Sequence, residues 1–368
     1  MAEPRDTRAG AGRIRVAQWG TGNAGSVALG AILDDPGLEL VALWVARSSS
    51  ASRDASELAI RRAGTGAVGV AATTDPTAVL AARPDCVVYM ATDRDRAEEV
   101  VDDLATILAA GINVVATTMP MLVHPDGAGP VVRARLAAAC ASGNSSFLCT
   151  GIEPGFTADA LVLTLSSLSR EITRVYVQEA MNVGSYRVPR WRSGLGNNIH
   201  QDATLYREGH IARGWTGVLT LLADGLGVTL EEIREVRRVA AAGRVFEVPA
   251  GRYGPDDVAA LNFQVIGVVG GEPRLVVDHT YRLLDEVAPD WPQPLAPDRR
   301  TTRIRISGVP DIDVTLELGG AGLDPTDQGV LGTAMRAVHA IPAVVAAPAG
   351  MRTSLDLPVI VGRHAMAP

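Results

Sequence analysis

Lysine is absent from this chain of 368 residues, so arginine supplies all 34 of its basic side chains. A Schiff-base lysine and a lysine general acid are therefore excluded. Acidic residues outnumber basic ones, and the formal net charge is −7. This balance argues against nucleic acid as a partner, because a protein that binds phosphate backbones needs a basic surface.

Cysteine is scarce. Cys86, Cys140 and Cys149 are too few and too scattered for a disulfide framework or a metal knuckle, which indicates a reducing, cytoplasmic setting. The six histidines form no HExxH or similarly spaced pair, so we expect no metal.

Long apolar runs are also lacking, and we expect no membrane span. The first segment, MAEPRDTRAGAGR, has no apolar core of the kind found in secretory signals. Residues 1–12 and 361–368 are expected to be disordered tails.

Strands and helices alternate in the first part of the chain. The strand patterns are IRVAQW, ELVALWV, PDCVVYMAT and INVVATT, and RAEEVVDDLATILAAG is a helix between the last two. This alternation predicts an α/β domain with a Rossmann-type, doubly wound parallel sheet over residues 13–150.

The first strand runs directly into GTGNAG, a glycine-rich turn that opens a helix. Gly20 permits the tight turn, Gly22 lets the backbone approach a pyrophosphate, and Gly25 lets the helix pack on the sheet. The free N–H groups of the helix then face the phosphates. We expect this segment to bind a dinucleotide through Gly20, Thr21, Gly22, Asn23, Ala24 and Gly25.

The second strand lacks the acidic residue that would hold the 2′-hydroxyl of NAD. Arg47 and Ser48 stand in that region, and a guanidinium suits a 2′-phosphate. NADP is therefore the expected cofactor and NAD the alternative; Arg47 as a solvated loop residue is the plainer interpretation. Small residues at two further strand ends leave room for a nicotinamide: Ala91, Thr92, Thr117 and Thr118.

After residue 150 the pattern changes to strands with little helix between them. GGEP and GVPD each join two strands as a hairpin, and helices are expected near 157–169 and 216–235. We predict an inserted α+β domain over 151–322, built on a mainly antiparallel sheet that serves substrate binding and homodimer formation. Residues 323–360 return to the dinucleotide-binding domain, with Asp324 or Thr326 capping a helix.

Several motifs occur in a familiar order: GTGNAG, GINVVATT, TGIEPGF, YRVPRWRSGLG, VVDHTYRL and AVHAIPAVVAAPAG. Over residues 13–360 the chain resembles the group of 2,4-diaminopentanoate dehydrogenases and native amine dehydrogenases, which is related to dihydrodipicolinate reductase through its N-terminal domain. The resemblance implies a Rossmann domain with an inserted domain, a dimer, and reversible NAD(P)-linked reduction of a C=N or C=O bond.

The chain departs from this group after the NVV strand. Amine-handling members resemble one another in a glutamate there, whereas this chain has Met119 and Pro120. An apolar side chain cannot pair with an ammonium ion, which favours a neutral carbonyl or imine substrate. The paired-histidine and lysine site of dihydrodipicolinate reductases is absent as well.

Three residues are candidate catalytic groups. Glu153 lies in TGIEPGF, which is expected to form the hinge between the domains; Tyr186 follows a strand of the inserted domain; and His279 shares a strand face with Val277 and Tyr281. Each is a possible proton donor. Each also has a structural reading: a hinge carboxylate, an ordinary loop tyrosine and a buried core histidine.

The candidate substrate-binding residues are Met119, His124, Arg187, Arg190 and His200. Either arginine would hold a carboxylate, and His124 stands close enough to the missing glutamate to replace it, although a plain loop histidine is the alternative. We expect a cytoplasmic, NADP-dependent oxidoreductase acting on a small, largely apolar molecule. The alternative is a nucleotide-binding redox sensor or a non-catalytic partner subunit.

Overall fold

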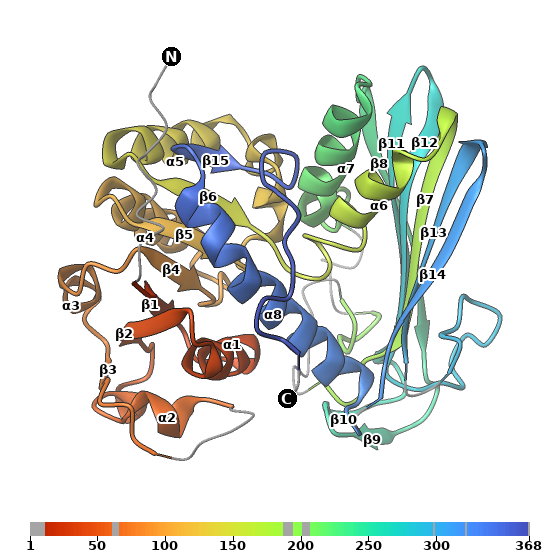
Figure 1. Ribbon diagram of the computed structural model, residues 1–368. Coiled ribbons are helices and arrows are strands. Elements are labelled where there is room, and N and C mark those ends of the chain that lie inside the picture. Colours follow the sequence, from red (N-terminus) through yellow and green to blue (C-terminus); the bar gives the residue numbers. More distant parts are fainter. Residues whose placement is uncertain are drawn as a thin grey trace. The chain divides into compact units, whose positions relative to one another are not determined.

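The computed structural model describes residues 12–60, 66–186, 194–200, 207–296, 299–320 and 322–366. The chain divides into two compact units. Unit 1 comprises Met1–Gly155 and Val330–Pro368, and unit 2 comprises Phe156–Gly329. Unit 2 therefore interrupts unit 1 in the sequence, as the colours of Figure 1 show.

Unit 1 is built on a seven-stranded sheet in the order β15-β6-β5-β4-β1-β2-β3, in which every neighbouring pair is parallel. The strand order reverses direction at β1, and ligands bind at such switch points in open α/β sheets. The predicted α/β class and the Rossmann-type sheet are confirmed. The strands are β1 (Ile14–Trp19), β2 (Leu38–Trp44), β3 (Ala72–Thr73), β4 (Cys86–Tyr89), β5 (Asn113–Ala116), β6 (Ser146–Cys149) and β15 (Gly350–Arg352).

Helices cover both faces of this sheet. Val16 of β1 lies in a buried cluster with Leu29 and Ile341, which places α1 and α8 on one face. Tyr89 of β4 points the other way and donates a hydrogen bond to Asp103 of α4 (2.7 Å). The helices are α1 (Asn23–Asp34), α2 (Ala55–Leu58), α3 (Pro76–Ala81), α4 (Ala97–Ala109), α5 (Pro130–Gly143) and α8 (Pro325–Ala346), with short 3₁₀ turns η1 (Ser48–Ser50), η2 (Pro120–Val123) and η3 (Pro125–Ala128).

Helix α8 connects the two units in sequence. Asp324 accepts hydrogen bonds from the N–H groups of Thr326 (2.8 Å) and Asp327 (3.0 Å), which confirms the predicted cap. Within the described ranges, α8 is the one helix long and apolar enough to cross a membrane by length and composition. Its apolar residues from Ala334 to Val344 pack into the core of unit 1, as those of a core helix do.

Unit 2 contains a six-stranded mixed sheet in the order β14-β13-β7-β12-β11-β8. The β7–β12 pair is parallel, and the other neighbours are antiparallel. The two predicted hairpins are confirmed as β11–β12 and β13–β14. The strands are β7 (Arg170–Asn182), β8 (Glu232–Ala241), β11 (Val258–Val269), β12 (Glu272–Arg282), β13 (Arg300–Val309) and β14 (Ile312–Leu318), and β9 (Phe246–Val248) pairs separately with β10 (Gly251–Tyr253).

Among its described residues, unit 2 also contains the helices α6 (Ala160–Ser166) and α7 (Ala212–Leu226). The prediction of a helix over 216–235 is wrong at its end. Gly227 adopts the left-handed conformation (φ 66°) that terminates α7, and residues from Glu232 onward form β8. Pairing of β8 with β11 overrides the helix propensity of EEIREVRR.

The C-terminal segment corrects a second expectation. Residues 361–366 are not a disordered tail but lie against α1, where His364 Nδ1 is 2.9 Å from a carboxylate oxygen of Asp35. The expected tail at residues 1–12 falls almost wholly outside the described residues.

Candidate functional site

The turn between β1 and α1 is shaped by glycines. Gly20 has a positive φ of 98°, and a Cβ on Gly25 would lie 2.2 Å from the carbonyl oxygen of Gly20, so neither position accepts a side chain without strain. A Cβ on Gly22, in contrast, would meet no heavy atom within 4 Å. The open space at Gly22 is where a pyrophosphate would approach the backbone.

Side chains hold this turn in place. Gln18 donates a hydrogen bond to the carbonyl oxygen of Gly20 (2.9 Å), and the Ser26 hydroxyl donates to that of Thr21 (3.0 Å). Helix α1 begins at Asn23 with no side-chain cap and no acidic residue in its first turn. Its first N–H groups and the positive end of its dipole are therefore suited to phosphate oxygens. The predicted segment Gly20–Gly25, including Ala24, fits a dinucleotide.

Arg47 and Ser48 follow β2, next to this turn in the sheet. Both side chains are exposed, and Ser48 begins the 3₁₀ turn η1. At the ends of these strands, Trp44 of β2 stacks on Trp19 of β1, with ring centroids 5.0 Å apart. The segment that contains Arg47 begins directly after this aromatic pair.

The other predicted cofactor residues lie at the ends of β4 and β5. Thr118 is buried, and its hydroxyl donates to the carbonyl oxygen of Ala91 (2.5 Å), which ties the two strand ends together. The Thr92 hydroxyl accepts a hydrogen bond from the backbone N–H of Arg94 (3.1 Å). Thr117 is half-buried between these strand ends. Because these strands are parallel, the four residues share one edge of the sheet with the glycine turn.

Met119 directly follows this edge. Its backbone is left-handed (φ 56°, ψ 68°), and its side chain is buried. His124, which follows in the same loop, is also buried. Its Nδ1 accepts a hydrogen bond from the backbone N–H of Asp126 (3.2 Å). A neutral His124 therefore carries its proton on Nε2, and the ring serves as the cap of η3.

Glu153 lies close to Gly155, where the first segment of unit 1 ends. Both of its carboxylate oxygens are buried, and the bond from Glu153 to Pro154 is cis.

The remaining candidates lie in unit 2. Tyr186 is half-buried just after β7, where its backbone N–H donates to the carbonyl oxygen of Val183 (3.0 Å). His200 is exposed, with Nε2 3.9 Å from a carboxylate oxygen of Asp256. Arg187 and Arg190 lie outside the described residues.

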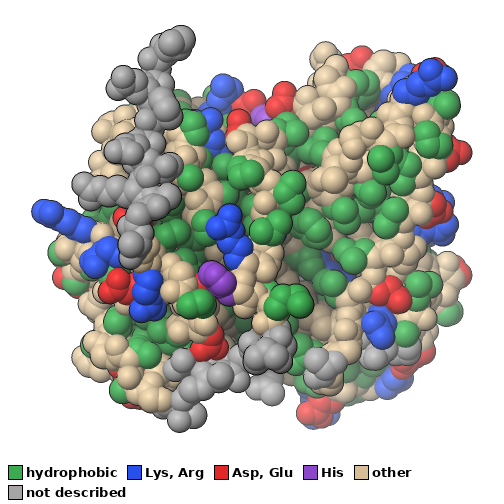
Figure 2. Space-filling view, in the orientation of Figure 1, with side chains coloured by type: hydrophobic (Ala, Val, Ile, Leu, Met, Phe, Trp, Pro, Cys, Tyr) green, Lys and Arg blue, Asp and Glu red, His purple; other side chains and the backbone are tan. Residues whose placement is uncertain are grey.

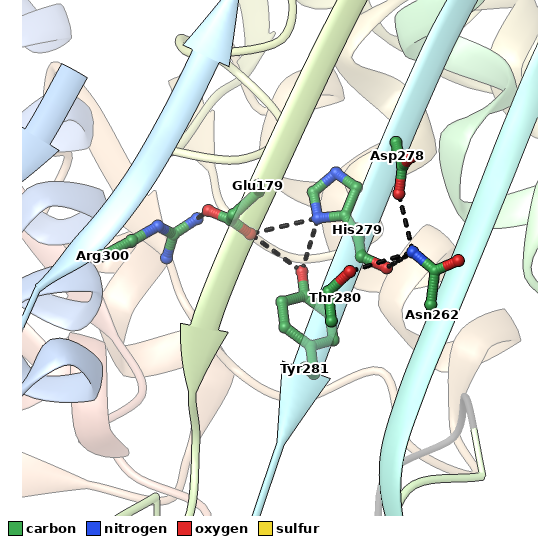
Figure 3. Close-up of polar contacts among 7 residues, drawn as sticks. All are labelled: Glu179, Asn262, Asp278, His279, Thr280, Tyr281 and Arg300. Carbon is green, nitrogen blue, oxygen red and sulfur yellow. Dashed lines mark hydrogen bonds and ion pairs between the residues drawn. The ribbon is translucent and has the colours of Figure 1, made fainter. Parts of the chain in front are cut away.

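His279 is fully buried in a polar cluster (Figure 3). Its Nδ1 lies 3.1 Å from a carboxylate oxygen of Glu179 on β7 and 2.8 Å from the hydroxyl of Tyr281. The Tyr281 hydroxyl donates to the same Glu179 oxygen (3.0 Å), and Arg300 of β13 forms an ion pair with the other oxygen. The His279 ring stacks on Phe263 with centroids 5.1 Å apart.

Sequence reasoning identified His279 but missed Glu179 and Arg300. A detectable signal existed for Glu179, because the alternation of VYVQEAM places it on the same strand face as Val175 and Val177. An acidic side chain on an apolar face requires a buried partner. Nothing in the sequence names that partner, since Arg300 is 121 positions away.

Among the described residues, no group of three His, Cys, Asp or Glu side chains is arranged to hold a metal ion. Acidic and basic side chains are interspersed on the face shown in Figure 2 rather than gathered by sign.

Comparison with known proteins identifies the family. The family model of the 2,4-diaminopentanoate dehydrogenase C-terminal domain matches residues 156–367. A protein of Streptomyces virginiae named amine dehydrogenase is 34% identical over 351 residues, which cover 94% of this chain and 96% of that protein. The 2,4-diaminopentanoate dehydrogenase of Acetoanaerobium sticklandii is 23% identical over 266 residues, 70% of each chain.

A solved structure agrees in fold. The amine dehydrogenase from Mycobacterium smegmatis superposes with a TM-score of 0.78 at 21% identity, covering 95% of this chain and 97% of that one. Together with the glycine turn and the open α1 N-terminus, these matches imply a nicotinamide cofactor and a small-molecule substrate. The chain belongs to the 2,4-diaminopentanoate dehydrogenase family and is an NAD(P)-dependent oxidoreductase.

Proposed function

We propose that the protein uses NADP to reduce the C=N or C=O bond of a small, largely apolar molecule. The observation that carries the coenzyme choice is the exposed Arg47 followed by Ser48–Ser50 at the end of β2, where NAD enzymes of this architecture place a carboxylate. A guanidinium with neighbouring hydroxyls provides charge-assisted hydrogen bonds to a 2′-phosphate. The positions predicted to line the nicotinamide are Ala91, Thr92, Thr117 and Thr118.

The neutrality of the expected substrate is supported by two features. The buried Met119 is apolar where amine-handling relatives are expected to have a glutamate. Arg300 is already paired with Glu179, so this guanidinium offers no unbalanced charge to a substrate carboxylate. Arg187 or Arg190 would be needed if the substrate carries one.

The bound nicotinamide supplies the hydride, and the chain must supply a proton to the reduced nitrogen or oxygen. Among Glu153, Tyr186 and His279, we propose Tyr186 as the group that gives this proton. Tyr186 is half-buried, whereas His279 is 0% exposed and both carboxylate oxygens of Glu153 are buried. In the oxidative direction the same oxygen takes the proton back.

The experiment combines binding and turnover. NADPH should quench or shift the protein's tryptophan fluorescence with a Kd well below that of NADH, and NADPH oxidation should follow when aliphatic ketones, ketones with ammonium, or cyclic imines are added. Arg47→Ser should raise the KM for NADPH about tenfold while leaving that for NADH unchanged. Arg363→Ser makes the same change of charge on the exposed C-terminal segment and should leave both values unchanged.

Failure to bind NADPH at low salt would overturn the coenzyme choice. Turnover of simple primary amines that greatly exceeds ketone reduction would overturn the preference for a neutral substrate. Binding without any turnover would support the alternative of a nucleotide sensor, which the relatives named as dehydrogenases argue against.

We also propose a cytoplasmic homodimer. Cys86, Cys140 and Cys149 are buried free thiols, as expected in a reducing compartment, and burial raises the pKa of Cys86 to about 12. The sheet face of unit 2 opposite to α7 carries the exposed Val236 together with the alternating charges of Arg305 and Asp313, which suits contact with a second copy.

A further inference from the structure

The loop that follows β4 lies beside the glycine turn of unit 1. The backbone N–H of Met90 donates to the carbonyl oxygen of Trp19 (2.8 Å). A Cβ on Gly20 would lie 3.0 Å from the nitrogen of Ala91, so the turn and the start of the loop are in close contact. Strands β1 and β4 are neighbours where the strand order reverses, and the loops after such strands line the ligand crevice of open α/β sheets. This position makes residues 91–96, which we call the β4 loop, a candidate wall of the dinucleotide crevice.

The residues at the two ends of the β4 loop bind the same carboxylate oxygen. Tyr89, the last residue of β4, donates its hydroxyl hydrogen to Oδ2 of Asp103 in α4 (2.7 Å). The guanidinium of Arg96, which directly precedes α4, donates to the same Oδ2 (3.0 Å). Asp103 therefore holds the residue before the loop and the residue that ends it at a single point.

Hydrogen bonds within the β4 loop give it a defined shape. The Thr92 hydroxyl oxygen accepts from the backbone N–H of Arg94 (3.1 Å). The carbonyl oxygen of Asp93 accepts from the backbone N–H of Arg96 (3.1 Å), whose side chain is the one bound to Asp103. A loop that is ordered before its ligand arrives loses little conformational entropy on binding, which favours affinity.

The donor on the sheet side is itself held in place by aromatic rings. The Tyr89 ring stacks on Trp19, with centroids 5.7 Å apart, and Trp19 stacks in turn on Trp44. Tyr89 is 0% exposed. Burial and the neighbouring Asp103 carboxylate raise the pKa of Tyr89, so its hydroxyl keeps its proton and remains a donor at neutral pH. Asp103 is therefore attached to the sheet through a side chain of fixed position and fixed protonation.

We propose that Asp103 is a positioning residue for the nicotinamide dinucleotide: by binding Tyr89 and Arg96 together, it holds the β4 loop in the shape that receives the cofactor. The inference rests on dinucleotide binding at the glycine turn, which is part of the proposed function, and not on the choice between NADP and NAD. Asp103 acts on the cofactor through the loop and takes no part in the chemical step.

Asp103→Asn tests this role. A neutral amide cannot form the ion pair with Arg96, so the end of the β4 loop loses its charged anchor. In fluorescence titrations, we expect the Kd for NADPH and the Kd for NADH to rise by the same factor of at least about tenfold. Amide hydrogen exchange over residues 91–96 of the cofactor-free protein should become about tenfold faster. A folded Asp103→Asn protein with wild-type Kd values would overturn the proposal.

Asp102→Asn is the matched control. Asp102 is the neighbouring residue of α4, and its exposed carboxylate forms an ion pair with Arg135 of α5 instead of binding the loop. The variant makes the same change of charge on the same helix, and it should leave the Kd values and the loop exchange unchanged because exposed ion pairs contribute little. Equal losses of affinity in Asp102→Asn and Asp103→Asn would overturn the positioning role. A purely structural role for Asp103 would lower the Tm of Asp103→Asn and leave its Kd values unchanged.

Arg96→Gln keeps the proposal testable if Asp103→Asn does not fold. The Arg96 side chain is 28% exposed, and Asp103 would keep its hydrogen bond from Tyr89. This variant should raise both Kd values as Asp103→Asn does, and wild-type affinity in it would contradict the proposal. Tyr89→Phe, which keeps the ring stack and removes one of the two donors, should raise them by a smaller factor. If the wild type binds neither NADPH nor NADH, the proposed function and this role fall together, whereas binding that Asp103→Asn leaves unchanged overturns the role of Asp103 alone.

Discussion

A single carboxylate, Glu179, determines the charge of the buried cluster in unit 2. It balances Arg300 and accepts from His279 and Tyr281 at once. Removing one member of such a buried set leaves an uncompensated charge, which costs more than the pair itself contributes. The cluster therefore acts as a unit.

Acid stability provides a test of this charge state. The pKa of Glu179 falls from 4.5 to about 2 on folding. Its ionised carboxylate therefore stabilises the native state at pH values above 4.5, and this stabilisation is lost as the pH falls toward 2. Between pH 5 and pH 3.5, the free energy of unfolding of the wild type should fall by about 1 kcal/mol more than that of Glu179→Gln. Urea unfolding at both pH values measures the difference. Equal losses in the two proteins would mean that folding does not lower the pKa of Glu179.

The residues that the sequence could predict as candidates differ in a physical way from the buried partners that it could not predict. Arg47 and the three glycines stand at fixed offsets from a strand end, so local pattern is enough to place them. Glu179 and Arg300 depend on strand register across distant parts of the chain, which no local pattern encodes. His279 was predicted as a candidate, but its contacts with Glu179 and Phe263 depend on the same register.

At the scale of elements, the turn from β1 into α1 has one glycine that the packing requires and another that is proposed to contact the dinucleotide. Gly25 is needed by the fold, since its Cβ would press on the Gly20 carbonyl, whereas the Cβ of Gly22 would enter open space. The two positions therefore allow opposite predictions.

Gly22→Ala should fold with an unchanged Tm but bind NADPH at least about tenfold more weakly, because the methyl group occupies the path of the pyrophosphate. Gly25→Ala should lower the Tm by several degrees, on the order of 2 kcal/mol of overpacking. Thermal unfolding without ligand and fluorescence titration with NADPH measure the two effects. A Gly22→Ala protein with wild-type affinity would place the dinucleotide elsewhere.

The ends of helices and strands could be predicted where the sequence contains a local turn or a helix-terminating residue. Helix α4 and both hairpins of unit 2 appear where the periodicity and the GGEP and GVPD turns predict them. Helix α7 was placed too late because EEIREVRR consists of good helix formers, while pairing with β11 makes it a strand. Gly227 was the residue in the sequence that marked the end of α7.

At the scale of the whole molecule, the end of the chain completes the sheet of unit 1. Strand β15 pairs with β6, and α8 supplies Ala334, Val338 and Ile341 to the core around β1. Unit 1 therefore cannot form its core from residues before Gly155 alone. In the sequence, unit 2 is therefore preceded and followed by segments of the same unit.

The oligomeric state is the last prediction. We expect a homodimer formed through the face of the unit 2 sheet opposite to α7, where Val236 is 52% exposed and Arg305 lies over the Tyr176 ring at 5.4 Å. The wild type should sediment at twice the chain mass of 38.5 kDa, and Val236→Arg should sediment at one chain mass, because an arginine there would be buried without a partner. Val131→Arg, at an 80% exposed position of α5, should remain a dimer. A monomeric wild type, or a Val236→Arg protein that stays dimeric, would rule out this face as the interface.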